Sequence, residues 1–209
     1  MSTIPFLQRF RVTEEEAYDA FNLVEDELWK LGVLWRGSKL DKVKLRYDKN
    51  GFGTTKYRLR KIWETLWRDR RELAAEGYWQ KWTGEIVIPR HGFWWFSRQA
   101  SIEDVFRHEF GHALADLYPG ALKKGGVFRA AFGGSYGGTP AEERGVDGWE
   151  ERYVSEYATS ATQEDFAETF MLFVKHKGKI PARFARKPAI RKKWKAVAEI
   201  VKRVAAATR

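Results

Sequence analysis

Two histidines with a glutamate between them, His108, Glu109 and His112, form an H-E-x-x-H pattern. On a helix, positions four residues apart lie on one face, so both imidazoles can reach a single metal ion. Zinc binds imidazole nitrogens at about 2.0–2.1 Å. Glu109 points away from the line of the histidines and can contact a zinc-bound water instead. The spacing predicts a zinc site with Glu109 as general base. The alternative is a surface helix with two solvated histidines.

A catalytic zinc needs a third protein ligand and keeps one position for water. The chain has no cysteine, which leaves His91, His176 or a carboxylate. Glu164 and Glu168 stand four residues apart among phenylalanines, where an unpaired acid is costly. We favour Glu164 as the third ligand because ligation would offset this cost, whereas His176, three turns further along the same helix, is too distant to be a co-ligand. Glu168 is expected to accept a hydrogen bond from the second nitrogen of a ligating histidine. The alternative is that both glutamates are solvated.

Two further residues are candidates for supporting roles. A phenol such as that of Tyr157, beside a zinc-bound carbonyl, can donate a hydrogen bond to the developing oxyanion; otherwise Tyr157 is an ordinary half-buried tyrosine. Asp116 follows His112 by four residues on the same helix face. It could be another acceptor behind a ligand, or simply a polar residue at the end of the helix.

The stretches HEFGHALAD and SEYATSATQEDFAETF resemble the gluzincin metallopeptidases, in particular the catalytic domain of anthrax lethal factor and related toxin and phage zincin domains. The resemblance covers roughly residues 84–176 and implies a zinc metalloendopeptidase with a zincin-like fold. The roles that it implies are zinc ligands at His108, His112 and Glu164, the catalytic base at Glu109, a substrate-facing phenol at Tyr157 and an acid behind a histidine ligand at Glu168.

The elements that must position these residues follow from apolar periodicity and capping boxes. Helices are expected over 13–31, 56–76, 101–118, 163–176 and 189–207, and strands over 42–48, 84–89 and 92–97. This order predicts an α+β fold: a small mixed sheet, an active-site helix and a later ligand-bearing helix.

Two further segments, one before the H-E-x-x-H helix and one after it, could border the cleft. Residues 120–148, which include GGSYGG, are expected to be a long loop that serves as a lid over the cleft or as a flexible excursion. By the resemblance, residues 84–97 could offer a strand edge to extended substrate, with Trp94 and Trp95 flanking the cleft. Burial of these tryptophans in the core is the alternative.

The chain is expected to form one zincin-like domain over residues 1–178, followed by a basic helical extension over 179–209. A net charge of +10 favours nucleic acid or an acidic partner, or serves solubility. The absence of cysteine excludes disulfides, thiolate zinc sites and a cysteine nucleophile. The sequence shows no apolar run typical of a membrane span or classical export signal, which favours a cytoplasmic location or delivery by a non-classical route.

Three functions are therefore considered. The first is a zinc endopeptidase that acts on a protein or peptide substrate. The second is a nucleic-acid-associated metalloprotein, or a protease that acts on DNA-bound proteins. The third is a zinc-binding interaction module without catalysis, which the intact Glu109 argues against, because a purely structural zinc site has no use for that carboxylate.

Overall fold

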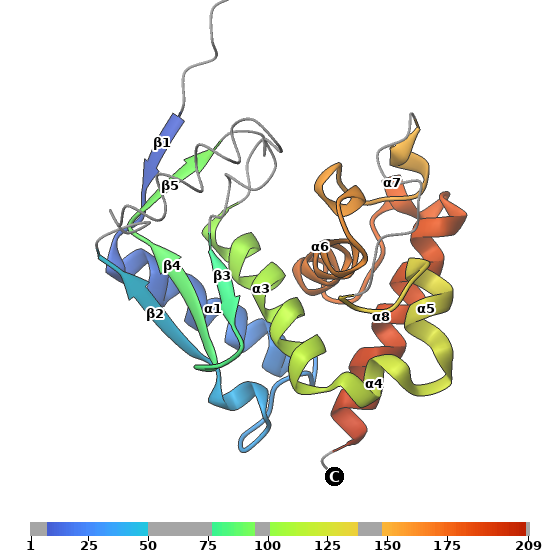
Figure 1. Ribbon diagram of the computed structural model, residues 1–209, viewed down its shortest axis with the longest axis horizontal. Coiled ribbons are helices and arrows are strands. Elements are labelled where there is room, and N and C mark those ends of the chain that lie inside the picture. The colour runs from blue at the N-terminus through green and yellow to red at the C-terminus, as the bar shows by residue number, and fades with distance from the viewer. Residues whose placement is uncertain (1–7, 50–76, 95–100, 138–147, 208–209) are drawn as a thin grey trace, which may run out of the picture.

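The computed structural model describes residues 8–49, 77–94, 101–137 and 148–207. The helix expected over 56–76 and the side chain of Trp95 lie outside these residues. Small sheets occupy one side of the molecule and a group of helices the other, with helix α3 (Ile102–Leu117) between them (Figure 1). The helix that carries H-E-x-x-H is therefore placed where both halves can reach it.

The strands form two small sheets. In the three-stranded sheet, β4 (Glu85–Pro89) lies between β2 (Lys44–Asp48), to which it is parallel, and β3 (Tyr78–Gln80), to which it is antiparallel. β1 (Gln8–Arg11) pairs with β5 (His91–Trp94) in an antiparallel ribbon. The strands expected over 42–48 and 84–89 are confirmed, and β5 begins one residue before the third expected strand. β3 was not predicted, because three residues are too few to show a periodicity.

Helix α1 (Glu14–Lys30) begins at the expected capping box. The Thr13 hydroxyl accepts a hydrogen bond from the Glu16 amide, and the Glu16 carboxylate accepts one from the Thr13 amide at 2.7 Å. Its apolar face packs on α3, where the ring of Phe21 lies 5.5 Å from the rings of Phe106 and Phe110. Burial of this face fixes α3 from the side that faces away from its histidines.

Helix α3 is confirmed over the expected residues, with Ser101 as the N-cap that accepts from the Asp104 amide. Its partner is α6 (Thr162–Lys175), also as expected. The two helices meet at Gly111, where an added Cβ would lie 3.2 Å from the Ala167 Cα. The glycine inside H-E-x-x-H thus permits the close approach of the helix that carries His108 and His112 to the helix that carries Glu164.

The segment expected as a long loop is partly helical. It contains α4 (Pro119–Lys123), a 3-10 turn (Lys124–Gly126) and α5 (Val127–Phe132). The expectation of a loop was wrong over these residues, because Phe128 and Phe132, one turn apart, are buried and stack at 4.8 Å. Burial of two aromatic rings outweighs the poor helix propensity of the surrounding glycines. Residues 138–147 lie outside the described part.

The expected C-terminal helix is confirmed as α8 (Pro188–Ala206), which follows the short α7 (Ala182–Ala185). α8 packs on α4, α5 and α6 (Figure 1). Its buried apolar residues are Ile190, Trp194, Ala196, Val197, Ile200, Val201 and Val204. A domain boundary near residue 178 remains a prediction. Among the helices in the described ranges, none has the length and apolarity needed to cross a membrane.

Candidate metal centre

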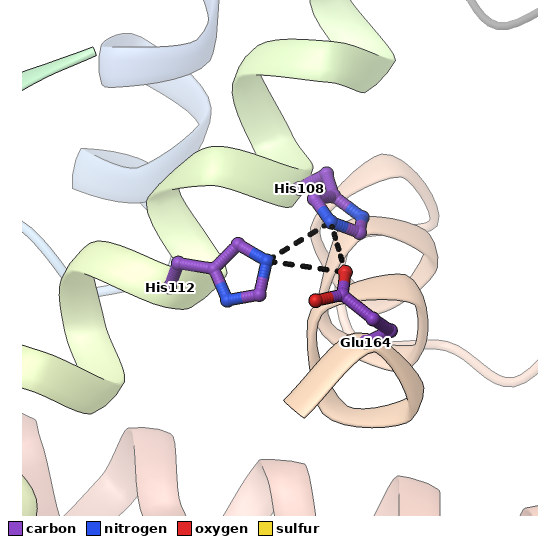
Figure 2. Close-up of side chains that lie close together, drawn as sticks. All are labelled: His108, His112 and Glu164. Carbon is purple, nitrogen blue, oxygen red and sulfur yellow. Dashed lines mark hydrogen bonds and ion pairs between the residues drawn. The ribbon is translucent and has the colours of Figure 1, made fainter. Parts of the chain in front are cut away.

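His108 and His112 project from adjacent turns of α3 toward Glu164, which lies in the first turn of α6 (Figure 2). The two Nε2 atoms are 3.1 Å apart. Glu164 Oε2 lies 3.2 Å from His108 Nε2 and 3.4 Å from His112 Nε2. Three donor atoms from two helices therefore form a nearly equilateral triangle.

The dimensions of this triangle fit zinc. Ligand atoms at about 2.0–2.1 Å from a tetrahedral ion are about 3.3–3.4 Å from one another. The three donor atoms match this separation within a few tenths of an ångström, and in the described residues they form the only group of His, Asp and Glu side chains that could hold a metal ion. Two imidazoles and one carboxylate are a ligand set that zinc uses in catalytic sites, where water takes the fourth position.

The pKa values of His108 and Glu164 are shifted because the two groups are buried together. Burial lowers the pKa of His108, but hydrogen bonds to Glu164 and Glu168 outweigh it and raise that pKa well above its ordinary value. Burial raises the pKa of Glu164, but its hydrogen bonds with His108 and His112 outweigh it and lower that pKa. Glu164 is thus a carboxylate under ordinary conditions, and a cation that binds here replaces a proton on His108.

Each imidazole has a second partner on its Nδ1 atom. His108 Nδ1 lies 2.8 Å from Glu168 Oε1, and the other oxygen of Glu168 accepts a hydrogen bond from the Ser155 hydroxyl at 2.7 Å. His112 Nδ1 lies 2.7 Å from the hydroxyl oxygen of Tyr136. With Nδ1 engaged in this way, each Nε2 can turn its lone pair toward the triangle.

Sequence reasoning missed Tyr136. It lies in GGSYGG, and no spacing rule relates this segment to His112; a single aromatic residue among glycines was the available signal. The structure places Asp116 elsewhere. One of its oxygens accepts from the Trp79 indole at 3.0 Å, and the other pairs with Lys81 at 3.1 Å. The partner of His112 Nδ1 is therefore the phenol of Tyr136, from a different segment, while Asp116, on the same helix as His112, binds Trp79 and Lys81.

Glu109 is buried, with 7% of its surface exposed, and does not belong to the metal-ligand group. Its Oε2 accepts a hydrogen bond from the backbone amide of Trp79 in β3 at 2.7 Å. Its negative charge contributes to raising the pKa of His108, which places it in the electrostatic environment of the ligands. A carboxylate held beside a metal site without ligating it is suited to accept a proton from water.

Tyr157 lies beside the ligands at the start of a 3-10 turn (Tyr157–Thr159). Its ring centre is 5.8 Å from that of His108, and 45% of the residue is exposed. Burial around the hydroxyl, followed by the charges of Glu164 and Glu109, raises the pKa of Tyr157. The phenol therefore keeps its hydrogen at neutral pH and can donate a hydrogen bond to a ligand.

Other candidates lie apart from the triangle. His176 is the C-cap of α6, twelve residues or about 18 Å along the helix from Glu164. His91 lies in β5, in the two-stranded sheet that β5 forms with β1. The expected substrate edge over 84–97 is wrong for β4, which is paired on both sides and cannot accept another strand. For β5, which among the described strands pairs with β1 alone, it stays a prediction. Both β3 and β4 contact α3, and β3 does so more extensively. The side chain of Trp94 lies outside the described part.

Comparison with known families agrees with this centre. A family model described as "Putative zinc-binding metallo-peptidase" matches residues 103–182, which contain all three members of the triangle. The match supports a zinc metallopeptidase family and, at family level, metallopeptidase activity on a protein substrate. The helices and small sheet are compatible with an α+β metallopeptidase domain. No curated protein and no solved structure matches the chain.

Proposed function

We propose that the protein is a zinc-dependent metalloendopeptidase of the H-E-x-x-H gluzincin type, with a zincin-like fold related to the lethal-factor domain and to toxin and phage zincins. The observation that carries the proposal is the triangle of His108, His112 and Glu164, whose edges of 3.1–3.4 Å suit a tetrahedral zinc. These three residues would hold the ion.

We assign the steps of peptide hydrolysis to the polar groups beside the triangle. When bound, zinc would polarise the scissile carbonyl and lower the pKa of the attacking water. Glu109 accepts the proton of that water and then donates it to the leaving amine. The Trp79 amide holds one Glu109 oxygen during this exchange. Tyr157 donates a hydrogen bond to the carbonyl oxygen as negative charge develops on it.

The deciding experiment compares the wild type with Glu109→Gln and Glu164→Gln in metal analysis and in cleavage of an unbiased peptide library. We expect about one zinc per chain in the wild type and in Glu109→Gln, with hydrolysis in the wild type alone. Glu164→Gln should lose zinc and activity together. A wild-type protein that takes up no zinc at neutral pH would refute the proposal, and so would a Glu109→Gln variant with undiminished hydrolysis.

A second candidate function rests on the distribution of charge. Residues 177–209 hold twelve of the 38 Lys and Arg residues but only one of the 28 Asp and Glu residues, so this segment has a net charge of +11 in a chain of +10. Exposed cations on α8 include Arg191, Lys192, Lys195 and Lys202. We propose that this face contacts nucleic acid phosphates and brings the peptidase to DNA-bound proteins.

Its test is a gel shift with duplex and single-stranded DNA over a range of salt. A shift that weakens with salt and is lost when Lys192, Lys195 and Lys202 are changed to Gln supports it. The matched control changes three exposed cations on the sheet side, Arg36, Lys42 and Lys44, to Gln. Absence of a shift at low salt, or equal loss in both triple variants, would exclude this second candidate.

A further inference from the structure

The second half of GGSYGG brings Tyr136 against the ligand His112. The Tyr136 hydroxyl oxygen lies 2.7 Å from His112 Nδ1, and the two rings meet edge to face with centres 6.3 Å apart. The phenol ring also packs edge to face on Phe128 and Phe166, at 5.8 and 6.1 Å. Tyr136 is therefore held by aromatic neighbours from α5 and α6 while its polar end meets a histidine of α3.

The backbone around Tyr136 is fixed to the start of α6. Thr162, which is buried and lies two residues before Glu164, donates a hydrogen bond from its hydroxyl to the Ser135 carbonyl oxygen at 3.0 Å. Gly133 and Gly137 have φ angles of 75° and 70°, which residues with a side chain rarely adopt. These glycines let the chain turn on both sides of Tyr136, so the segment reaches both ligand-bearing helices.

Resting on the proposed zinc function, we propose that Tyr136 is the positioning residue of His112: its hydroxyl oxygen accepts a hydrogen bond from Nδ1–H and so keeps the lone pair of Nε2 directed at the metal. Glu168 has the corresponding place behind His108. Asp116, the acid one turn after His112, binds Trp79 and Lys81. The ligand pair thus has one anionic and one neutral supporting acceptor.

The neutral acceptor has an electrostatic reason. Glu164, Glu168 and Glu109 already place three carboxylates around the histidine pair. A phenol is neutral at pH 7, because its ordinary pKa is about 10. The phenol therefore supplies an oxygen acceptor without a further negative charge. Its hydroxyl orients the imidazole, and its ring fills the space between α5 and α6.

The test is the zinc affinity of Tyr136→Phe, which keeps the ring and removes only the hydroxyl. Zinc dissociation constants are measured by competition with a chromophoric chelator. Loss of the partner behind a ligating histidine is expected to weaken zinc binding by about 10–100-fold. The matched control is Tyr118→Phe, which deletes the hydroxyl of a buried tyrosine whose oxygen accepts a hydrogen bond from the Lys39 amide at 3.0 Å. This control should bind zinc within about twofold of the wild type, because the hydrogen bond that it loses is to a backbone amide and not to a residue of the triangle.

A second readout separates positioning from general stability. The visible absorption of the Co²⁺-substituted protein reports ligand geometry and should change in Tyr136→Phe but not in Tyr118→Phe. Melting temperatures of the two zinc-free variants should stay close to that of the wild type. Wild-type zinc affinity in Tyr136→Phe would overturn the assignment, as would equal weakening in both variants. If the wild type hydrolyses peptides in a zinc-dependent way and Tyr136→Phe binds zinc as tightly as the wild type does, the inference about Tyr136 fails and the proposed function stands.

Discussion

Lys193 of α8 and Asp165 of α6 form a buried ion pair, with Nζ 2.7 Å from Oδ2 and side-chain exposures of 6% and 1%. The same ammonium donates to the Arg152 carbonyl oxygen at 2.6 Å and lies 3.9 Å from the centre of the Tyr153 ring. Asp165 directly follows the proposed ligand Glu164. The basic C-terminal helix therefore supports the first turn of α6 and the segment that leads to Tyr157.

Lys193→Met should destabilise the protein strongly. Removing one partner of a buried pair leaves the other charge uncompensated, which costs about 3–5 kcal/mol. The measurement is the free energy of unfolding from urea titration. Lys192→Met, one residue earlier and exposed, is the control and should change it by less than about 0.5 kcal/mol. Similar effects of the two substitutions would show that the pair does not support the fold.

Gly111→Ala should weaken both folding and zinc binding. An added Cβ meets the Ala167 Cα and the Phe170 ring at 3.2 Å, so α6 must move away from α3 and take Glu164 with it. Such overpacking costs about 1–3 kcal/mol, more than alanine gains over glycine in a helix. Melting temperature and zinc affinity measure the effect. Gly120→Ala in α4 meets open space and should be neutral or stabilising; equal losses in both would contradict the packing argument.

Tyr157→Phe should lower kcat and leave the zinc content unchanged. Loss of one donor to a developing oxyanion typically lowers kcat by about 10²–10³-fold. KM should change little, since the hydrogen bond strengthens only as charge develops on the carbonyl oxygen. Steady-state hydrolysis of a cleaved library peptide measures both constants. A large rise in KM at constant kcat would assign Tyr157 to substrate binding.

Stabilisation by zinc should increase with pH. In the zinc-free folded protein the pKa of His108 is raised above its ordinary value of 6.5. Protonation of His108 therefore stabilises the fold fully below pH 6.5, and this stabilisation is lost as pH rises through the raised pKa. Zinc must displace that proton, so its apparent affinity rises with pH. The zinc-induced increase in melting temperature should be larger at about pH 8 than at about pH 6. An increase that does not depend on pH would contradict this linkage.

The sequence was most informative where a local spacing rule applied. Positions four residues apart on a helix predicted that His108 would share a face with His112, and that Glu164 would lie one turn from Glu168. The helices over 101–118 and 163–176 followed from periodicity and capping. The meeting of these two helices was expected from the cost of an unpaired acid at Glu164 among phenylalanines, and the resemblance implied the same arrangement.

What could not be predicted depends on contacts between distant segments. Tyr136 reaches His112 only because α5 folds back on α6, and the glycines of that region favoured a loop over the helices that form there. Asp116 has the spacing expected of an acceptor behind His112, but β3 brings Trp79 and Lys81 to it. β3 itself is only three residues long, below the length at which alternation becomes visible.

The hydrogen bond between the Trp79 amide and Glu109, the proposed general base, does not depend on the side chain at position 79. A main-chain donor is present in every amino acid except proline. Replacing the indole can therefore abolish the bond to Asp116 while the carboxylate keeps its anchor. Any residue except proline at position 79 can therefore supply the backbone N–H that binds Glu109.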